Sequence, residues 1–486
     1  MPNFRPGSVT MDCEVLAGSG TMRSDLFGGQ GMGADSAHQK QGESPMVSRK
    51  IDRRGLIQGT AVGAGAAMFA KSSFAQDATA CADDAAVPAA PEYDGSEVTI
   101  SYGIWDSAQQ AGIERQIEAF KEVQPNITVE IQLTPWADYW TKLQTAVAGG
   151  EAFDVFWLNS ANCPVYASAG ALVPLDSVFE GEGGLDRSNY PAQILDLYNY
   201  NGVQYGTPRE YDTIALFYNK DIFDAAGIDY PDDTWDWDKF HEVAEQLTDE
   251  ENGIYGVGLH LGGQENYTNF VLQNEGRYLN DALDACVVAD EVVAGEALQW
   301  VTEFYLDGLT PGVDIQQGNP APDTLFPGGV VGMLPGGSFR AKTYHDLIEG
   351  GFNVGVAPLP QGKVRGTVIH GLGNVVWSGS QNIGAAAEFA KFLGGEEAAH
   401  ILADSGIGLP AFAGQEGPWL ESVSGLDAQV FIDAAEYGVI PQDPEVGPAW
   451  QSALGEQVLA GFAGEIPLED IPQTVQDAVN AALQDS

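Results

Sequence analysis

The stretch AFKEVQPNITVEIQLTPWADYWTKLQTAVAGGEAFDVFW, residues 119–157, decides the fold class of this chain. Within it, residues 127–133 alternate apolar and polar side chains, which is typical of a strand with one solvated face. Residues 140–148 follow a helical period, and residues 153–157 form a short apolar run that suits a buried strand. Strands that alternate with helices in this way predict a parallel sheet with crossover helices.

The alternation extends in both directions from this stretch. A strand at 98–102 and a helix at 110–123 precede it, and the tail from 428 to 483 has a mostly helical pattern. The whole therefore predicts an α/β protein. Between these parts we expect strands at 213–217, 330–333, 353–357, 366–370 and 374–378, and helices at 237–246, 294–304 and 385–393.

Composition and charge narrow the possible partners. The chain has 486 residues, too many for one ordinary core, and 44% of them are hydrophobic, which excludes global disorder. Its 69 acidic and 21 basic residues give a net charge of −48. Because phosphate backbones repel such a polyanion, nucleic acid is not an expected partner. The acidity is consistent with a salty habitat and equally with simple solubility.

Metal and nucleotide chemistry find no support in the residue spacing. The four cysteines include no CxxC pair, and the six histidines include no HxH or HExxH motif. No Walker loop, no GxSxG elbow and no strand followed by GxGxxG is present. We therefore expect no metal and no cofactor.

The N-terminal region has the pattern of an export signal. Arg53 and Arg54 precede a weakly apolar run, and Ser73-Phe74-Ala75 supplies small residues at a cleavage site, so residues 46–75 resemble a twin-arginine signal peptide. Residues 1–45 are polar and aperiodic, and we interpret them as a non-native or disordered extension. Residues 76–96 are rich in Ala, Pro and Asp and are interpreted as a flexible linker, in which Cys81 is a candidate for lipid anchoring.

From residue 98 onward, five segments stand in the order typical of one family. The chain resembles the extracellular solute-binding proteins of ABC importers, specifically the carbohydrate-binding class that includes maltodextrin-binding proteins. The segments are residues 119–157 quoted above, YASAGALVPLD (166–176), YGTPREYDTIALFYNKDIFDAAGI (205–228), TWDWDKF (234–240) and GSFRA (337–341).

The resemblance implies two α/β lobes, each a sheet flanked by helices, joined by hinge strands and closing over a ligand. By analogy, residues 97–211 and 365–410 form lobe 1, and residues 212–360 and 411–486 form lobe 2. It also implies a monomeric, periplasmic or extracellular binding subunit, not an enzyme. Such a subunit would take a mono- or oligosaccharide and pass it to the transmembrane subunits of an ABC permease.

A sugar ring needs an aromatic platform for its apolar face and planar polar groups for its hydroxyls. Trp157, Asn159 and Ser160 come at the carboxyl end of a predicted strand, where ligands bind in open α/β sheets. Trp157 could instead pack in the core, and the two polar residues could cap a helix.

A second group lies at the expected hinge. Arg209, Tyr211 and Asp212 follow Pro208, and the resembling proteins place an acidic ligand residue at Asp212. Arg209 could equally form a structural ion pair. The candidate set is completed by residues at sheet ends and loops, namely Trp105, Asp106, Tyr267, Phe339, His370, Gly371 and Trp450. Trp136 and Trp140 are expected to be structural.

Two other functions remain open at this point. The ligand could be another solute, such as a sugar phosphate or a polyamine. A secreted glycoside hydrolase would also use aromatic rings with paired carboxylates. Because acidic residues are so numerous here, the presence of such pairs does not discriminate.

Overall fold

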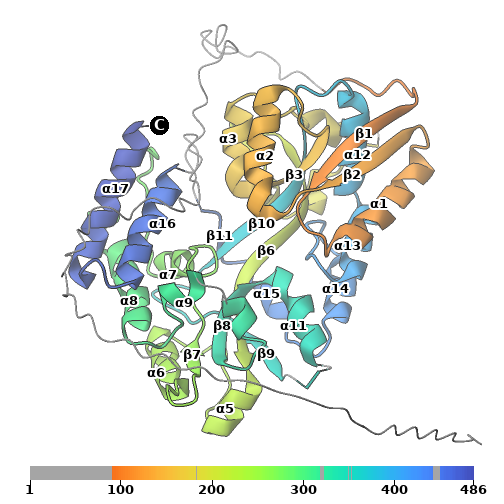
Figure 1. Cartoon of the computed structure of the whole chain (residues 1–486). Helices are drawn as coiled ribbons and strands as arrows, with labels where there is room; N and C mark the ends of the chain where they lie inside the picture. Colours follow the sequence, from red (N-terminus) through yellow and green to blue (C-terminus); the bar gives the residue numbers. More distant parts are fainter. Residues whose placement is uncertain are drawn as a thin grey trace, which may run out of the picture. The chain divides into compact units, whose positions relative to one another are not determined.

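The computed structural model describes residues 90–181, 183–317, 322–348, 350–351, 353–441 and 449–485 (Figure 1). The predicted extension at 1–45, the signal peptide at 46–75, Cys81 and most of the predicted linker lie outside these residues. Within the described ranges, none of the helices combines the length and the apolar character that a membrane span needs.

The stretch that decided the fold class forms the predicted strands and helices. β1 (Val98–Ile104) pairs in parallel with β2 (Ile127–Leu133) and with β3 (Val155–Asn159). The helices between them are α1 (Gln110–Val123) and α2 (Trp136–Gly149). Because the three strands run in one direction, their carboxyl ends lie at the same edge of the sheet.

Two long strands extend this sheet through the middle of the chain. β10 (Thr367–Val376) is antiparallel to β3 and to β6 (Gly206–Asn219), whose second half continues to β8 (Val331–Gly337) and β9 (Val354–Ala357). The strand order is β2-β1-β3-β10-β6-β8-β7, where β7 is Tyr255–Val257. In addition, β9 pairs with β6, and β11 (Gly438–Val439) pairs with β10.

The sheet is therefore mixed, not purely parallel as the alternation predicted. The strands expected at 366–370 and 374–378 are one strand, with a register shift between Leu372 and Gly373. A Cβ at Gly373 would lie 2.7 Å from the Tyr198 ring, so the absence of a side chain lets β10 pass this ring without breaking.

Buried apolar side chains form two groups, separated along β6 by strand alternation. Ala215 and Phe217 belong to the larger group, which also packs β1, β3 and β10 against α12 (Ile383–Gly394). Ile214, Leu216 and Tyr218 point into the smaller group. In it, α16 (Ala449–Phe462) and α17 (Ile471–Asp485) pack on each other and on α8 (Val292–Leu306) (Figure 1).

The other α-helices and strands, together with the 3-10 helix η4, complete the fold. They are α3 (Cys163–Ser168), α4 (Ala192–Asp196), β4 (Asn199–Tyr200), β5 (Val203–Gln204), α5 (Lys220–Ala226), α6 (Trp237–Leu247), β7 (Tyr255–Val257), α7 (Tyr267–Gln273), α9 (Val313–Gln317), α10 (Pro322–Leu325), η4 (Ser338–Arg340), α11 (Ala341–Ile348), α13 (Glu396–Ser405), α14 (Glu416–Ser422), α15 (Gln429–Ala434) and β11 (Gly438–Val439). The predicted lobe boundaries stay predictions.

Candidate ligand-binding site

The pairing of β6 with β10 places Asp212 directly opposite His370. Asp212 Oδ2 lies 3.6 Å from His370 Nδ1, and Asp212 Oδ1 accepts a 2.8 Å hydrogen bond from Ser338 Oγ on η4. Burial raises the pKa of Asp212 well above its usual range, against the effect of the Ser338 hydrogen bond. Burial also lowers the pKa of His370 to about 4, so this pair is not an ion pair at neutral pH.

His370 has a second partner on the loop that precedes α7. The amide nitrogen of Gln264 lies 2.5 Å from His370 Nε2. Because an amide nitrogen only donates, Nε2 must accept, and the single proton of the neutral ring is on Nδ1, the nitrogen nearer Asp212. Nearby, Asn269 fastens the loop to β10, since its side chain donates to the Gln264 carbonyl and accepts from the Val368 N–H, both at 2.8 Å.

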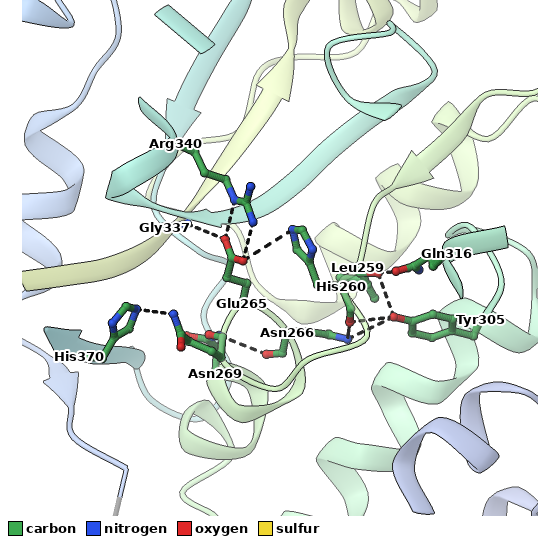
Figure 2. A network of polar contacts seen from close by, with 11 residues as sticks. Leu259, His260, Glu265, Asn266, Asn269, Tyr305, Gln316, Gly337, Arg340 and His370 are labelled. Carbon is green, nitrogen blue, oxygen red and sulfur yellow. Dashed lines mark hydrogen bonds and ion pairs between the residues drawn. The ribbon is translucent and has the colours of Figure 1, made fainter. Parts of the chain in front are cut away.

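The same loop carries a buried ion pair. Arg340 Nε donates to Glu265 Oε1 and Arg340 Nη2 donates to Oε2, both at 2.7 Å, and the Gly337 N–H donates to Oε1 at 3.0 Å (Figure 2). Burial raises the pKa of Glu265, but the Arg340 hydrogen bonds and charge outweigh it and hold the pKa at about 2. A two-point contact of this kind fixes the geometry of both side chains.

A second buried ion pair lies on the first half of β6. Arg209 Nη1 donates to Glu210 Oε2 at 2.6 Å, and both side chains are almost fully buried. The Arg209 guanidinium also lies 4.8 Å from the centre of the Trp157 ring. Trp157 Nε1 donates to the Tyr102 hydroxyl at 2.6 Å, and this hydroxyl donates to Asn374 Oδ1 on β10. These contacts form a polar network that reaches from β6 to β10, in which the buried Arg209 Nε and Asn374 Nδ2 have no hydrogen-bond partner among the described residues.

We call the paired strands β6 and β10 the crossing, with Arg209 and Glu210 in its first half and the residues around Asp212 in its second half. Comparison with known proteins identifies the family of this chain. The family of bacterial extracellular solute-binding proteins matches residues 104–400, more than half of the chain. The chain belongs to this family. As the family name states, its members bind solutes outside the cytoplasm.

Relatives and solved structures agree with this assignment. The galactooligosaccharide-binding protein of Bacillus subtilis is 25% identical over 318 residues, covering 62% of this chain and 70% of that protein. The maltotriose-binding protein of Pyrococcus abyssi is 22% identical over 360 residues, covering 70% and 72%. An ABC substrate-binding protein from Listeria monocytogenes, in complex with cycloalternan, superimposes with a TM-score of 0.74 at 27% identity, covering 79% of this chain and 99% of that one. The predicted binding-protein fold is confirmed.

In this solute-binding protein, three further predicted site residues lie around the pair of Asp212 and His370. The first is the half-buried Phe339, whose ring centre lies 6.4 Å from the centre of the imidazole. Gly371 follows on β10, where a Cβ would lie 2.8 Å from the Glu210 carbonyl oxygen. Tyr211 is opposite Gly371 in the register and is buried.

Other predicted site residues are placed differently from what we expected. The Trp157 ring, expected to face the ligand, has no exposed surface, because it lies between Trp105, Tyr102 and Arg209. Tyr267 and Trp450 are buried in the smaller hydrophobic group. Their roles in binding stay predictions, and in this conformation none of these three rings offers a face to a solute.

The polar residues near the sheet edge make local bonds. Asn159 Oδ1 accepts a 3.2 Å bond from the Asn162 N–H, which is the capping role left open by the sequence. Ser160 Oγ accepts a 3.4 Å bond from the Gly371 N–H and so touches β10. Asp106 Oδ1 accepts from the Ala108 N–H at 2.8 Å, and Trp105 is half-buried.

Sequence reasoning missed Gln264, Glu265 and Arg340. Arg340 directly follows the quoted Gly-Ser-Phe, and only 13 basic residues follow Gln76, so an Arg in a family segment was a usable signal. Its partner Glu265, one of many acidic residues, carried no local signal. Trp136 was expected to be structural, but 52% of it is exposed.

A cavity of about 580 Å³ lies at the carboxyl end of β6, away from Asp212. Its lining residues include Asn219, Asp221 and Asp249. The described part of its lining carries no aromatic ring. It therefore lacks the platform that a sugar would need.

Proposed function

We propose that this solute-binding protein is the substrate-binding subunit of an ABC importer and that it captures a mono- or oligosaccharide at the crossing of β6 and β10. The observation that carries the proposal is the meeting of Asp212, His370 and Phe339 at this crossing. A carboxyl group, an imidazole and a half-buried phenyl ring are groups that suit a saccharide. A hydrophobic core requires neither the carboxyl group nor the imidazole.

The charges at the crossing favour a neutral ligand. Both arginines nearby already have a carboxyl partner, which is Glu210 for Arg209 and Glu265 for Arg340. A phosphate would have to displace these partners before it could bind either guanidinium. The raised pKa of Asp212 makes it a weak partner for a polyamine, which requires ionised carboxylates. A sugar hydroxyl, by contrast, can bond to Asp212 in either protonation state.

The names of the relatives support the same ligand class. Those quoted above are named for galactooligosaccharides and maltotriose, and the solved structure from Listeria monocytogenes holds cycloalternan. We extend this to the present chain as part of the proposal, together with the absence of catalysis and a monomeric state.

Titration calorimetry of the purified protein tests the proposal. The probes are galactooligosaccharides, maltooligosaccharides and arabinooligosaccharides of one to six rings, with glycerol phosphate and spermidine as alternatives. We expect one saccharide series to bind with one site per monomer and without cleavage during prolonged incubation. Preference for glycerol phosphate or spermidine, or turnover of any glycan, would refute the proposal.

Export and delivery belong to the same proposal. We propose that the twin-arginine leader with Arg53 and Arg54 exports the protein and that the transmembrane subunits of a permease receive the sugar from it. Mass spectrometry of the exported protein should find an N-terminus at Gln76, or a lipid on Cys81. If a variant with both Arg53→Lys and Arg54→Lys is exported as well as the native protein, the leader assignment is contradicted.

A further inference from the structure

Trp136 is exposed to solvent near the carboxyl ends of the parallel strands β1 and β2. It is the first residue of α2, three residues after β2 ends at Leu133, and 52% of it is exposed. Leu133 is opposite Ile104, the last residue of β1, and Trp105 follows immediately. Trp136 and Trp105 therefore stand at the sheet edge where solutes bind in α/β proteins.

The exposed ring is held by other rings. The centre of the Trp136 ring lies 5.2 Å from that of Trp105 and 5.3 Å from that of Trp140, at interplanar angles of 73° and 90°. Trp105 in turn contacts Tyr139 at 5.0 Å and Trp157 at 5.1 Å, both edge to face. Such contacts fix the orientation of Trp136 before any ligand arrives, which reduces the entropy cost of stacking on it.

The ring cluster also connects Trp136 with the crossing. Trp157 links it to Arg209 on β6, whose neighbour Glu210 accepts a 3.3 Å bond from the Gln109 side chain at the start of α1. The exposed patch is small, consisting of the indole and Leu133, whereas a stable protein partner covers about 800 Å² on each side. One sugar ring is of the right size, and the exposed Asp138 and half-buried Asp106 nearby in sequence can accept from its hydroxyls.

We infer that Trp136 is the platform of an outer subsite, on which a second or later ring of the ligand stacks. The inference rests on the proposed function and makes it narrower, because it selects an oligosaccharide over a monosaccharide. The crossing holds the inner ring, and the Trp136 face adds affinity only when the chain of sugars reaches the sheet edge.

The test compares affinities for saccharides of increasing length. Trp136→Ala and Trp136→Phe are titrated with galactose, maltose, maltotriose, maltohexaose and the corresponding galacto- and arabinooligosaccharides. Tyr230→Ala is the matched control, because Tyr230 is also a partly exposed aromatic backed by other rings, but it packs on Tyr218 and Phe223. Urea unfolding confirms that each variant keeps its fold.

We expect the native protein to bind longer members of one series more tightly, and Trp136→Ala to lose about tenfold for these members while the shortest ligand that binds changes less than about twofold. Trp136→Phe should keep part of the gain, and Tyr230→Ala all of it. Equal affinity of Trp136→Ala and the native protein at every length, or the same loss at every length, overturns the inference and leaves the proposed function intact. If no saccharide of any length binds the native protein, the proposed function itself fails.

Discussion

Replacing Glu265 with Gln tests whether the buried ion pair stabilises the second half of the crossing. The side chains of Glu265 and Arg340 are only 13% and 18% exposed, so water screens their interaction weakly. The change keeps the shape of the side chain and its acceptor for the Gly337 N–H but removes the charge that faces Arg340.

The pKa of Glu265 gives the magnitude. It lies at about 2 in the folded protein against 4.5 for a free side chain, and each pKa unit is worth about 1.4 kcal/mol. The ionised carboxylate therefore contributes about 3 kcal/mol at pH 7. Because the folded pKa is depressed, this contribution is present above the unfolded pKa and disappears as the pH falls through the folded value. By linkage it is about half as large at pH 3.

Urea unfolding followed by circular dichroism at pH 7 and pH 3 measures the effect. We expect Glu265→Gln to lower the free energy of unfolding by about 3 kcal/mol at pH 7 and by about half of that at pH 3. The control is Glu242→Gln, which breaks the exposed pair with Lys239 and should cost less than about 1 kcal/mol. Equal losses in the two variants, or a loss for Glu265→Gln that does not change with pH, would refute the argument.

Three further predictions concern the first half of the crossing and the candidate site. Trp157→Ala removes a fully buried ring and should lower the free energy of unfolding by about 3–5 kcal/mol in urea titrations, whereas a loss below about 1 kcal/mol would contradict its core position. Phe339→Ala removes a half-buried ring and should weaken saccharide binding by about 1–3 kcal/mol in calorimetry; unchanged affinity would remove it from the site. The His370 imidazole should stay neutral from pH 8 to about pH 5 in NMR titrations, and a midpoint near 6.5 would show that it is not desolvated.

The first strands and helices followed from local pattern, and the later ones in part. Residues 127–133 and 110–123 have the bounds that the periodicity predicted, because the alternation of apolar residues is a property of neighbouring positions. β10 was predicted as two strands because its central Gly371-Leu372-Gly373 resembles a turn. Only pairing with β3 and β6 on its two sides keeps this segment extended.

The candidate site, too, was predicted from local sequence only in part. Asp212 was found from its place in a family segment, and its position beside His370, 158 residues later, followed from strand register that the sequence does not contain. Glu265 and Arg340 are 75 residues apart, and a charge-rich chain offers many alternative partners for each. Nothing local distinguishes the pair that forms.

The amino-acid sequence alone thus determined the α/β rhythm, the acidity and the family segments, because these depend on residue identity and short-range spacing. The tertiary structure decided which tryptophan is sealed and which is open. Trp157 and Trp136 both follow or end strands of the same sheet, yet packing against Tyr102 and Arg209 buries the first, while the position at the start of α2 leaves the second in solvent. Exposure depends on contacts between distant segments, and those exist only after the chain has folded.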